Sequence, residues 1–175
     1  AVYSCRYPQE VFVSGGWRRT RMMKHLLIVY HTQTGNTEAL ARAALQGASG
    51  ELVDNVETRF LRAGRAGAED LLWAHALILA TPENFGYMSG AMKDFLDRTF
   101  YPVEGKIVSL PYTVLISAGN DGSGALRSIR RIAGGYPFTE VQEPLIAQGA
   151  VTDVHLQRAE EIGLSLAAGL DVGIY

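Results

Sequence analysis

Three short, continuous apolar segments limit the folds open to this chain more than any other feature. They span residues 25–30, 76–81 and 112–117. Uninterrupted apolar runs of this length are typical of strands that are buried on both faces of a parallel sheet. A polar loop and then a stretch with helical periodicity follow each run, so the chain is expected to alternate strands with helices.

Weaker signals complete the series. Two further strands are predicted at residues 51–60 and 138–146. Apolar residues recur at helical spacing in five segments, which are residues 38–47, 68–75, 88–100, 125–133 and 155–168. Pro82 and Pro102 are expected to end the strand and the helix that precede them, because proline lacks a backbone N–H. This order predicts an α/β fold in which an open, doubly wound, five-stranded parallel sheet carries helices on both faces.

The composition restricts the class of protein. The 175 residues include 16 Lys and Arg against 18 Asp and Glu without a block of like charges, which argues against a nucleic-acid-binding protein. Hydrophobic residues make up 47% of the chain and are evenly spread, so we expect a folded domain without membrane insertion. The single cysteine, Cys5, excludes an internal disulfide and a cysteine-based metal site, and it favours a cytoplasmic location.

The first 21 residues differ in composition from the rest. They contain four arginines against one glutamate and contribute +3 to the net charge, whereas residues 22–175 contribute −5. No apolar run typical of a secretory signal occurs in them. We expect residues 1–21 to be a non-structural extension and residues 22–175 to form the domain, with an ordered N-terminal arm as the alternative.

The loop after the first strand has the residue types of an anion site. Hydroxyl and amide side chains surround a glycine just before a predicted helix, where backbone N–H groups and the helix dipole favour a phosphate. The candidates are Thr32, Gln33, Thr34, Gly35, Asn36 and Thr37. The alternative is an ordinary helix N-cap, which would explain one of these residues.

Two more loops are expected at the same edge of the sheet. In the first loop, a planar ring system could stack on Phe85 or Tyr87 while the loop backbone approaches the polar edge of that ring. The alternative is that both aromatic side chains pack under the following helix. This loop contains Pro82, Glu83, Asn84, Phe85 and Gly86. The second is rich in glycine, which would let its backbone reach a ligand lying across the sheet edge. It contains Ser117, Ala118, Gly119, Asn120 and Gly122.

Read together, the segments TQTGNT (32–37) and TPENFGYMSG (81–90), with MKDFLDR (92–98), resemble flavodoxin-like FMN proteins. The chain is most similar to their NAD(P)H-dependent FMN reductase and WrbA-type quinone reductase branch. The resemblance covers about residue 24 to the C-terminus. It implies a flavodoxin-like sheet with strand order 2-1-3-4-5 and FMN at the point where the strand order reverses.

The same resemblance implies a role for each loop. The residues at 32–37 would hold the FMN phosphate, those at 82–86 would lie along the isoalloxazine, and those at 117–122 would border its other side. The implied activity is transfer of hydride or electrons from NADH or NADPH through FMN to a quinone, flavin or similar small-molecule acceptor. Because the chemistry belongs to the flavin, no catalytic side chain and no metal are expected, and His31 and His155 are interpreted as loop or surface residues.

Two alternatives stay open. A flavodoxin-type electron carrier without NAD(P)H activity would dock its partners through a strongly acidic face, and a charge of −5 is mild for that role. A binding module that has lost the flavin fits least well, because the loops are intact. The resemblance also implies a homodimer or larger homo-oligomer, for which Trp17, Phe100 and Tyr101 are candidate interface residues or, equally, core residues.

Overall fold

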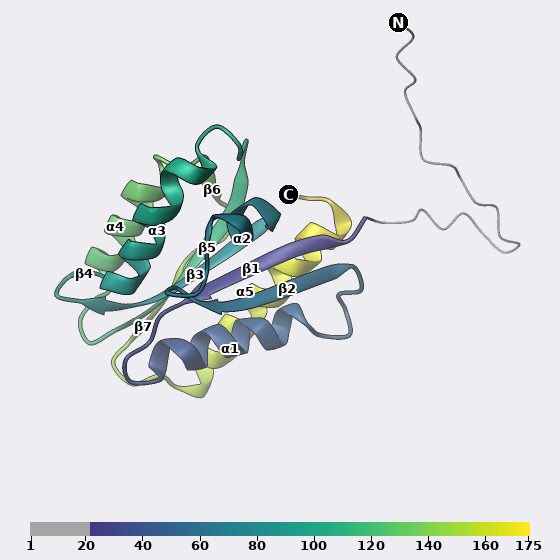
Figure 1. The fold of residues 1–175 in the computed structure, drawn as a ribbon. Coiled ribbons are helices and arrows are strands. Elements are labelled where there is room, and N and C mark those ends of the chain that lie inside the picture. Colours follow the sequence, from purple (N-terminus) through teal and green to yellow (C-terminus); the bar gives the residue numbers. More distant parts are fainter. Residues whose placement is uncertain (1–21) are drawn as a thin grey trace, which may run out of the picture.

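The computed structural model describes residues 22–175, which form a parallel sheet between two layers of helices (Figure 1). The expected extension and arm, and with them Trp17 and Cys5, lie outside the described residues. The strands are β1 (Lys24–Tyr30), β2 (Val56–Arg62), β3 (Ala76–Asn84), β4 (Tyr87–Met88), β5 (Leu110–Ala118), β6 (Phe138–Glu140) and β7 (Leu145–Gln148). The helices are α1 (Asn36–Ala48), α2 (Ala68–Trp73), α3 (Gly90–Val103), α4 (Ser123–Ala133) and α5 (Asp153–Val172).

The strand order confirms the predicted sheet. It runs β2-β1-β3-β5-β6, and β7 also pairs with β5 in parallel. Counting β6 and β7 as one interrupted edge strand, this is the predicted order 2-1-3-4-5. The prediction of a single strand over residues 138–146 is wrong, because the chain leaves the ladder between Glu140 and Leu145, where Pro144 has no N–H to donate.

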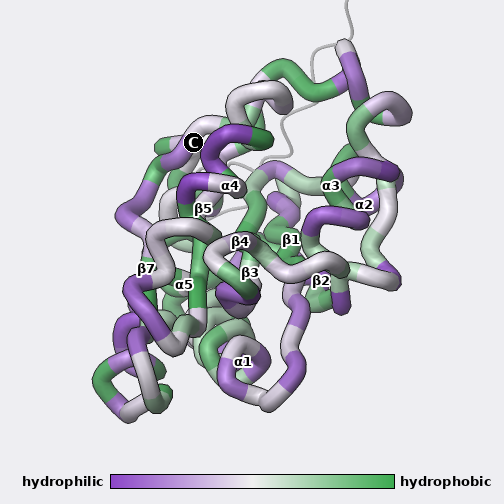
Figure 2. Tube along the Cα trace, turned by 90° about the vertical axis from the view of Figure 1, so that its left-hand side faces the viewer, coloured by the Kyte–Doolittle hydropathy of each residue, from purple (hydrophilic) through white to green (hydrophobic). Residues whose placement is uncertain are grey.

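The core has two halves because alternate residues of the central strands face opposite sides of the sheet. Leu26 and Ile28 of β1 pack with α1 and α5, whereas Leu27 and Val29 pack with α3 and α4. All four are fully buried. Figure 2 shows the same apolar character along β1, β3 and β5, between helices with mixed colours.

Helices α1 and α5 approach each other closely through two glycines. A Cβ at Gly47 would overlap the backbone of Glu160, and one at Gly163 would overlap the carbonyl of Ala44. Only glycine permits backbones to come this near. The contact covers one face of the sheet with a rigid helix pair.

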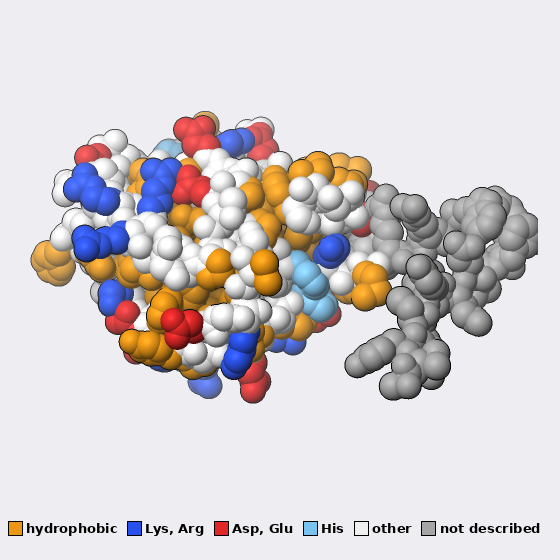
Figure 3. Space-filling view, turned by 90° about the horizontal axis from the view of Figure 1, so that it is seen from above, with side chains coloured by type: hydrophobic (Ala, Val, Ile, Leu, Met, Phe, Trp, Pro, Cys, Tyr) orange, Lys and Arg blue, Asp and Glu red, His pale blue; other side chains and the backbone are white. Residues whose placement is uncertain are grey.

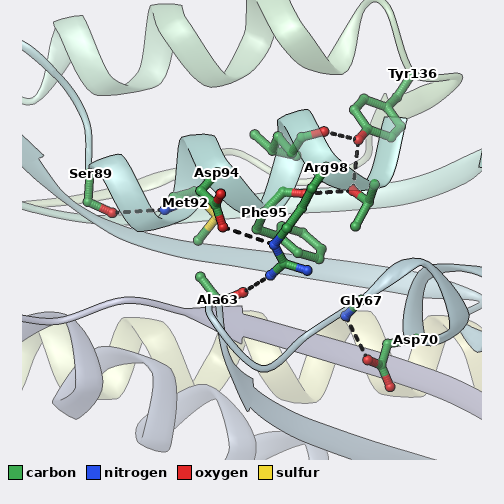
Figure 4. A network of polar contacts seen from close by, with 11 residues as sticks. Ala63, Gly67, Asp70, Ser89, Met92, Asp94, Phe95, Arg98 and Tyr136 are labelled. Carbon is green, nitrogen blue, oxygen red and sulfur yellow. Dashed lines mark hydrogen bonds and ion pairs between the residues drawn. The ribbon is translucent and has the colours of Figure 1, made fainter. Parts of the chain in front are cut away.

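The other face is tied together by polar contacts of α3 (Figure 4). The Ser89 hydroxyl accepts the Met92 N–H and caps the helix. Arg98 donates to the Ala63 carbonyl in the loop after β2 and pairs with Asp94 one turn earlier. Acidic and basic side chains are scattered among apolar and uncharged ones on the surface seen from this side (Figure 3).

Both expectations about proline are wrong. Strand β3 continues past Pro82 to Asn84. The carbonyl of Ala80 accepts the His31 N–H, so the backbone polar groups of residues 80 and 82 are directed toward β1. Strand β1 ends beside Ala80. The N–H that Pro82 lacks would therefore have no strand residue to pair with, and no ladder hydrogen bond is lost. Helix α3 continues past Pro102 to Val103, and the N–H of its C-cap residue Glu104 still donates to the Phe100 carbonyl.

In residues 22–175, no helix combines the length and the apolar character needed to cross a bilayer.

Candidate functional site

A cavity of about 270 Å³ opens at the carboxyl ends of β1, β3 and β5. All three predicted loops contribute to its wall. The lining residues are Gln33, Thr34, Asn36, Thr37, Pro82, Glu83, Asn84, Ser117, Ala118, Gly119 and Gly149. Segments 80 residues apart in sequence thus meet at the place where a doubly wound sheet binds ligands.

Six of the predicted residues do not line the cavity, although they lie in the same loops. Thr32 accepts the Gly35 N–H at 2.9 Å and shapes the first loop from behind. Phe85 and Gly86 form the tip of a hairpin beside the cavity. Gly122 is buried as the N-cap of α4, and Asn120 is exposed two residues before it.

Gly149 is the one lining residue that the sequence reasoning missed. It follows β7 with φ +73°, and its N–H donates to the Ala118 carbonyl at 2.7 Å. The predicted topology could have identified this residue. Strand β7 runs parallel to β5, so its carboxyl end and the loop after it lie at the same sheet edge as the three predicted loops.

The N-terminus of α1 presents backbone N–H donors next to the first loop. Gly35, with φ +95°, is the N-cap, and its carbonyl accepts from Ala39 in the first intrahelical bond. The N–H groups of Asn36, Thr37 and Glu38 therefore have no partner within the helix. Together with the helix dipole they form an anion-binding end.

The hydroxyl of Thr37 has a different role from those around it. Thr37 is 1% exposed, and its Oγ1 lies 2.7 Å from Oγ of Ser117 on β5. Thr34 is exposed and lines the cavity, so its hydroxyl is available to a ligand. The loop thus combines one structural hydroxyl with one accessible hydroxyl.

Charged side chains sit beside this loop on the β2 side. Glu38 is bridged by Arg42 at 2.7 Å and by Arg62 at 3.1 Å. Burial, with a smaller contribution from Arg62, lowers the pKa of His31 below its ordinary value of 6.5. The His31 Nδ1 is buried and has no hydrogen-bond partner among the described residues. His31 is thus favoured in its neutral form next to the anion-binding end.

A tight hairpin follows the central strand. Asn84 pairs with Tyr87, and the two residues between them, Phe85 and Gly86, have φ of +52° and +70°. Two consecutive positive φ values match a two-residue type I′ turn, which suits the twist of a hairpin. A bulky residue rarely adopts positive φ, so Phe85 is held in a strained conformation.

The aromatic residues separate into exposed and packed ones. The Phe85 side chain is fully exposed, which excludes packing under the following helix, and Tyr87 is 43% exposed. Phe100 packs edge-on against Tyr136 and belongs to the core boundary. Tyr101 is 78% exposed.

Metal-binding chemistry has no support in residues 22–175, which contain no cluster of three or more His, Cys, Asp or Glu side chains able to hold an ion.

Two curated relatives match part of the chain. A flavodoxin of Aquifex aeolicus (strain VF5) is 33% identical over 102 residues, which covers 58% of this chain and 54% of that protein. An NAD(P)H dehydrogenase (quinone) of Acidithiobacillus ferrooxidans (strain ATCC 53993 / BNL-5-31) is 29% identical over 121 residues, covering 58% and 60%. The chain thus spans little more than half the length of either relative.

Solved structures agree with the fold. A flavodoxin from the domain Archaea superposes with a TM-score of 0.72 at 23% identity, over 82% of this chain and 96% of that one. A WrbA-like flavodoxin from Agrobacterium tumefaciens gives a TM-score of 0.68 at 21% identity, over 85% and 99%. At this identity the likeness concerns the fold alone.

The family comparison covers the part of the chain that builds two of the three cavity loops. Residues 63–150 match the sequence model of a family described as NADPH-dependent FMN reductase. This segment runs from the residue after β2 to the residue after Gly149 and makes up half of the chain. The chain therefore belongs to the NADPH-dependent FMN reductase family.

Proposed function

We propose that this protein binds FMN in the cavity and acts as an oxidoreductase. NADH or NADPH would lose a hydride to the bound flavin, and a quinone, a free flavin or a similar small molecule would take up the two electrons. One observation carries the proposal: a single cavity is lined by the anion-binding N-terminus of α1 and by the ends of the neighbouring strands β3 and β5. Family membership and the quinone dehydrogenase relative support the same reaction class.

The residues of the first loop fit a phosphate monoester. The first three N–H groups of α1 have no partner within the helix, and Gln33, Thr34 and Asn36 line the cavity beside this helix end. These groups would hold the phosphate without a basic side chain, because Arg42 and Arg62 are engaged by Glu38. Thr32 and Gly35 would shape the loop from outside the cavity wall.

The second and third loops fit a planar ring. Pro82, Glu83 and Asn84 form one wall, and the residues from Ser117 to Gly119, at the end of the neighbouring strand β5, form the wall beside it. The exposed, strained Phe85 and Gly86 stand at the hairpin tip, and Asn120 and Gly122 stand at the start of α4, where they would border the ring edge.

FMN, when bound, supplies the hydride and electron transfer. The protein itself would orient the flavin ring, exclude water from its buried side and set the charge around it. No side chain is assigned to catalysis. The proposal takes residues 22–175 as the FMN-binding domain of a cytoplasmic homo-oligomer, with exposed Tyr101 at the interface between copies.

Absorption spectroscopy tests the proposal. The purified protein is titrated with FMN, freed of unbound flavin and mixed anaerobically with NADH or NADPH. Retained flavin absorption that either nucleotide bleaches is expected. Failure to retain FMN would contradict the proposal.

A flavodoxin-type electron carrier is the second candidate, because the Aquifex relative bears the name flavodoxin. It predicts flavin that dithionite reduces but NADH and NADPH do not. The same experiment therefore separates the two functions.

A further inference from the structure

We propose that Glu83 is a positioning residue that fastens one cavity wall to helix α4, and that its charge lowers the reduction potential of the bound flavin. The charge effect rests on the proposed function, whereas the fastening can be tested without a cofactor.

Glu83 lies near the end of β3, where it pairs with Met88 in the hairpin. Its Oε2 accepts the backbone N–H of Ala125 at 3.0 Å across 42 residues. Ala125 is the third residue of α4, whose own N-cap is Gly122 and so offers no capping side chain. Glu83 therefore satisfies a helix N-terminal donor from another element, in the position where a negative charge is favoured by the helix dipole.

Two further contacts hold the hairpin against the same helix. Gly124 meets the backbone of Gly86 so closely that a Cβ there would overlap it. The Ser128 hydroxyl accepts the Met88 N–H at 3.2 Å. Three attachments along one and a half turns fix the hairpin, and with it the direction of the wall formed by residues 82–84.

Glu83 differs from the other residues that line the cavity in having a carboxyl side chain. Among the lining residues of the described chain, Glu83 is the only one with an acidic or basic side chain. A flavin ring that takes up two electrons and one proton becomes an anion, so a fixed carboxylate beside the cavity would disfavour the reduced form relative to the neutral oxidised form. Charge placed near the ring is one of the means by which proteins tune this cofactor.

Asp121 offers a matched control. Its Oδ1 accepts the Ser123 N–H at 3.0 Å, so it also places a carboxylate at the start of α4. Asp121 is exposed and does not line the cavity. A change of Asp121→Asn removes the same charge from the same helix end without touching the wall.

Amide hydrogen exchange of the cofactor-free protein tests the fastening. In Glu83→Ala the Ala125 amide should exchange at least tenfold faster than in the wild type, whereas Glu83→Gln, which keeps an acceptor oxygen, should retain most of the protection. Asp121→Ala, which removes the acceptor of the Ser123 N–H, should speed exchange at Ser123 and leave Ala125 unchanged. Unchanged Ala125 exchange in folded Glu83→Ala would overturn the fastening.

Redox titration of the FMN complex tests the charge. Glu83→Gln should favour reduced over oxidised FMN about tenfold more than the wild type, which for two electrons is an upward shift of about 30 mV. Asp121→Asn should shift the potential by much less. An unchanged potential in Glu83→Gln, or equal shifts in the two variants, would overturn the charge effect. If the wild type binds no FMN, the proposed function and the charge effect both fail, and amide exchange still decides the fastening.

Discussion

The hydroxyls of Thr37 and Ser117 lie 2.7 Å apart although 80 residues separate them in the sequence. Thr37 belongs to the first turn of α1, and Ser117 lies one residue before the end of β5. Both side chains are buried. This bond joins the proposed phosphate loop to the wall formed by β5, so two parts of the cavity are held at a fixed spacing.

Removing either hydroxyl should destabilise the protein. Thr37→Val and Ser117→Ala each leave one buried hydroxyl without its partner, which should lower the free energy of unfolding by about 1–3 kcal/mol. The double variant should lose less than the sum, because no unpaired hydroxyl remains. Urea unfolding of the cofactor-free protein measures all four free energies. Strictly additive losses would show that the two hydroxyls act independently.

Thr34 should distinguish FMN from riboflavin. Its hydroxyl is free to donate to a phosphate, and a hydrogen bond to a charged group contributes about 1.5–3 kcal/mol. We expect Thr34→Ala to weaken FMN binding at least tenfold while leaving riboflavin binding nearly unchanged. Fluorescence titration with both flavins provides the comparison. Thr139→Ala, on the exposed edge strand β6, is the control and should alter neither affinity.

The contact between α1 and α5 should not tolerate a side chain at Gly163. A Cβ there would overlap the Ala44 carbonyl, so Gly163→Ala is expected to destabilise the fold by about 1–3 kcal/mol despite the better helix propensity of alanine. Gly64→Ala serves as the control, because a Cβ at Gly64 has open space around it. Thermal unfolding of both variants checks the difference. A Gly163→Ala protein as stable as the wild type would mean that the two helices can move apart freely.

The stability of the protein should fall on mild acidification because of His75. Its Nδ1 accepts the backbone N–H of His25 at 3.0 Å, and a protonated ring could not. Desolvation of the ring, followed by the charges of His25 and Lys24, lowers the pKa of His75 below 6.5. The unfolded state therefore binds the proton more readily, so the stabilisation is complete above pH 6.5 and is lost as the pH falls below that value.

Urea unfolding of the cofactor-free protein between pH 5 and 8 measures this effect. His75→Gln should flatten the dependence, and the remaining slope should come from His31, whose pKa is lowered in the same direction. A slope that survives unchanged in His75→Gln would assign the acid sensitivity to other groups.

The fold could be predicted because its central strands are buried on both faces. Such strands are largely apolar, and residues 26–30, 76–80 and 112–117, in which Thr113 and Ser117 are the buried polar members, show this directly. The edge strand at residues 138–146 was harder to predict. Residues 138–146 carry a weaker pattern, and their division into β6 and β7 depends on Pro144 and on pairing with β5 rather than on local preference.

The site was predicted to the level of its loops but not of its individual contacts. Thr37 and Thr34 have the same chemistry in the sequence, but Thr37 lies in the first turn of α1, buried against Ser117 of β5, whereas Thr34 lies exposed in the loop before the helix. Gly149 carries no side chain that would mark it. The bond from Glu83 to Ala125 depends on how a hairpin lies against a helix, which no local spacing encodes.

Strand β3 has a neighbour on each side from Leu77 to Ala80, next to the segment that lines the cavity. It pairs with β1 as far as Ala80 and with β5 as far as Pro82, after which β4 pairs with Glu83 and Asn84. In hydrogen exchange, fraying should therefore begin at the outer strands β2 and β6 and reach last the residues Leu77–Ala80 of β3, from which the wall at residues 82–84 extends. A flavin would then meet a surface that is already ordered, so little of its binding energy is spent on arranging the protein.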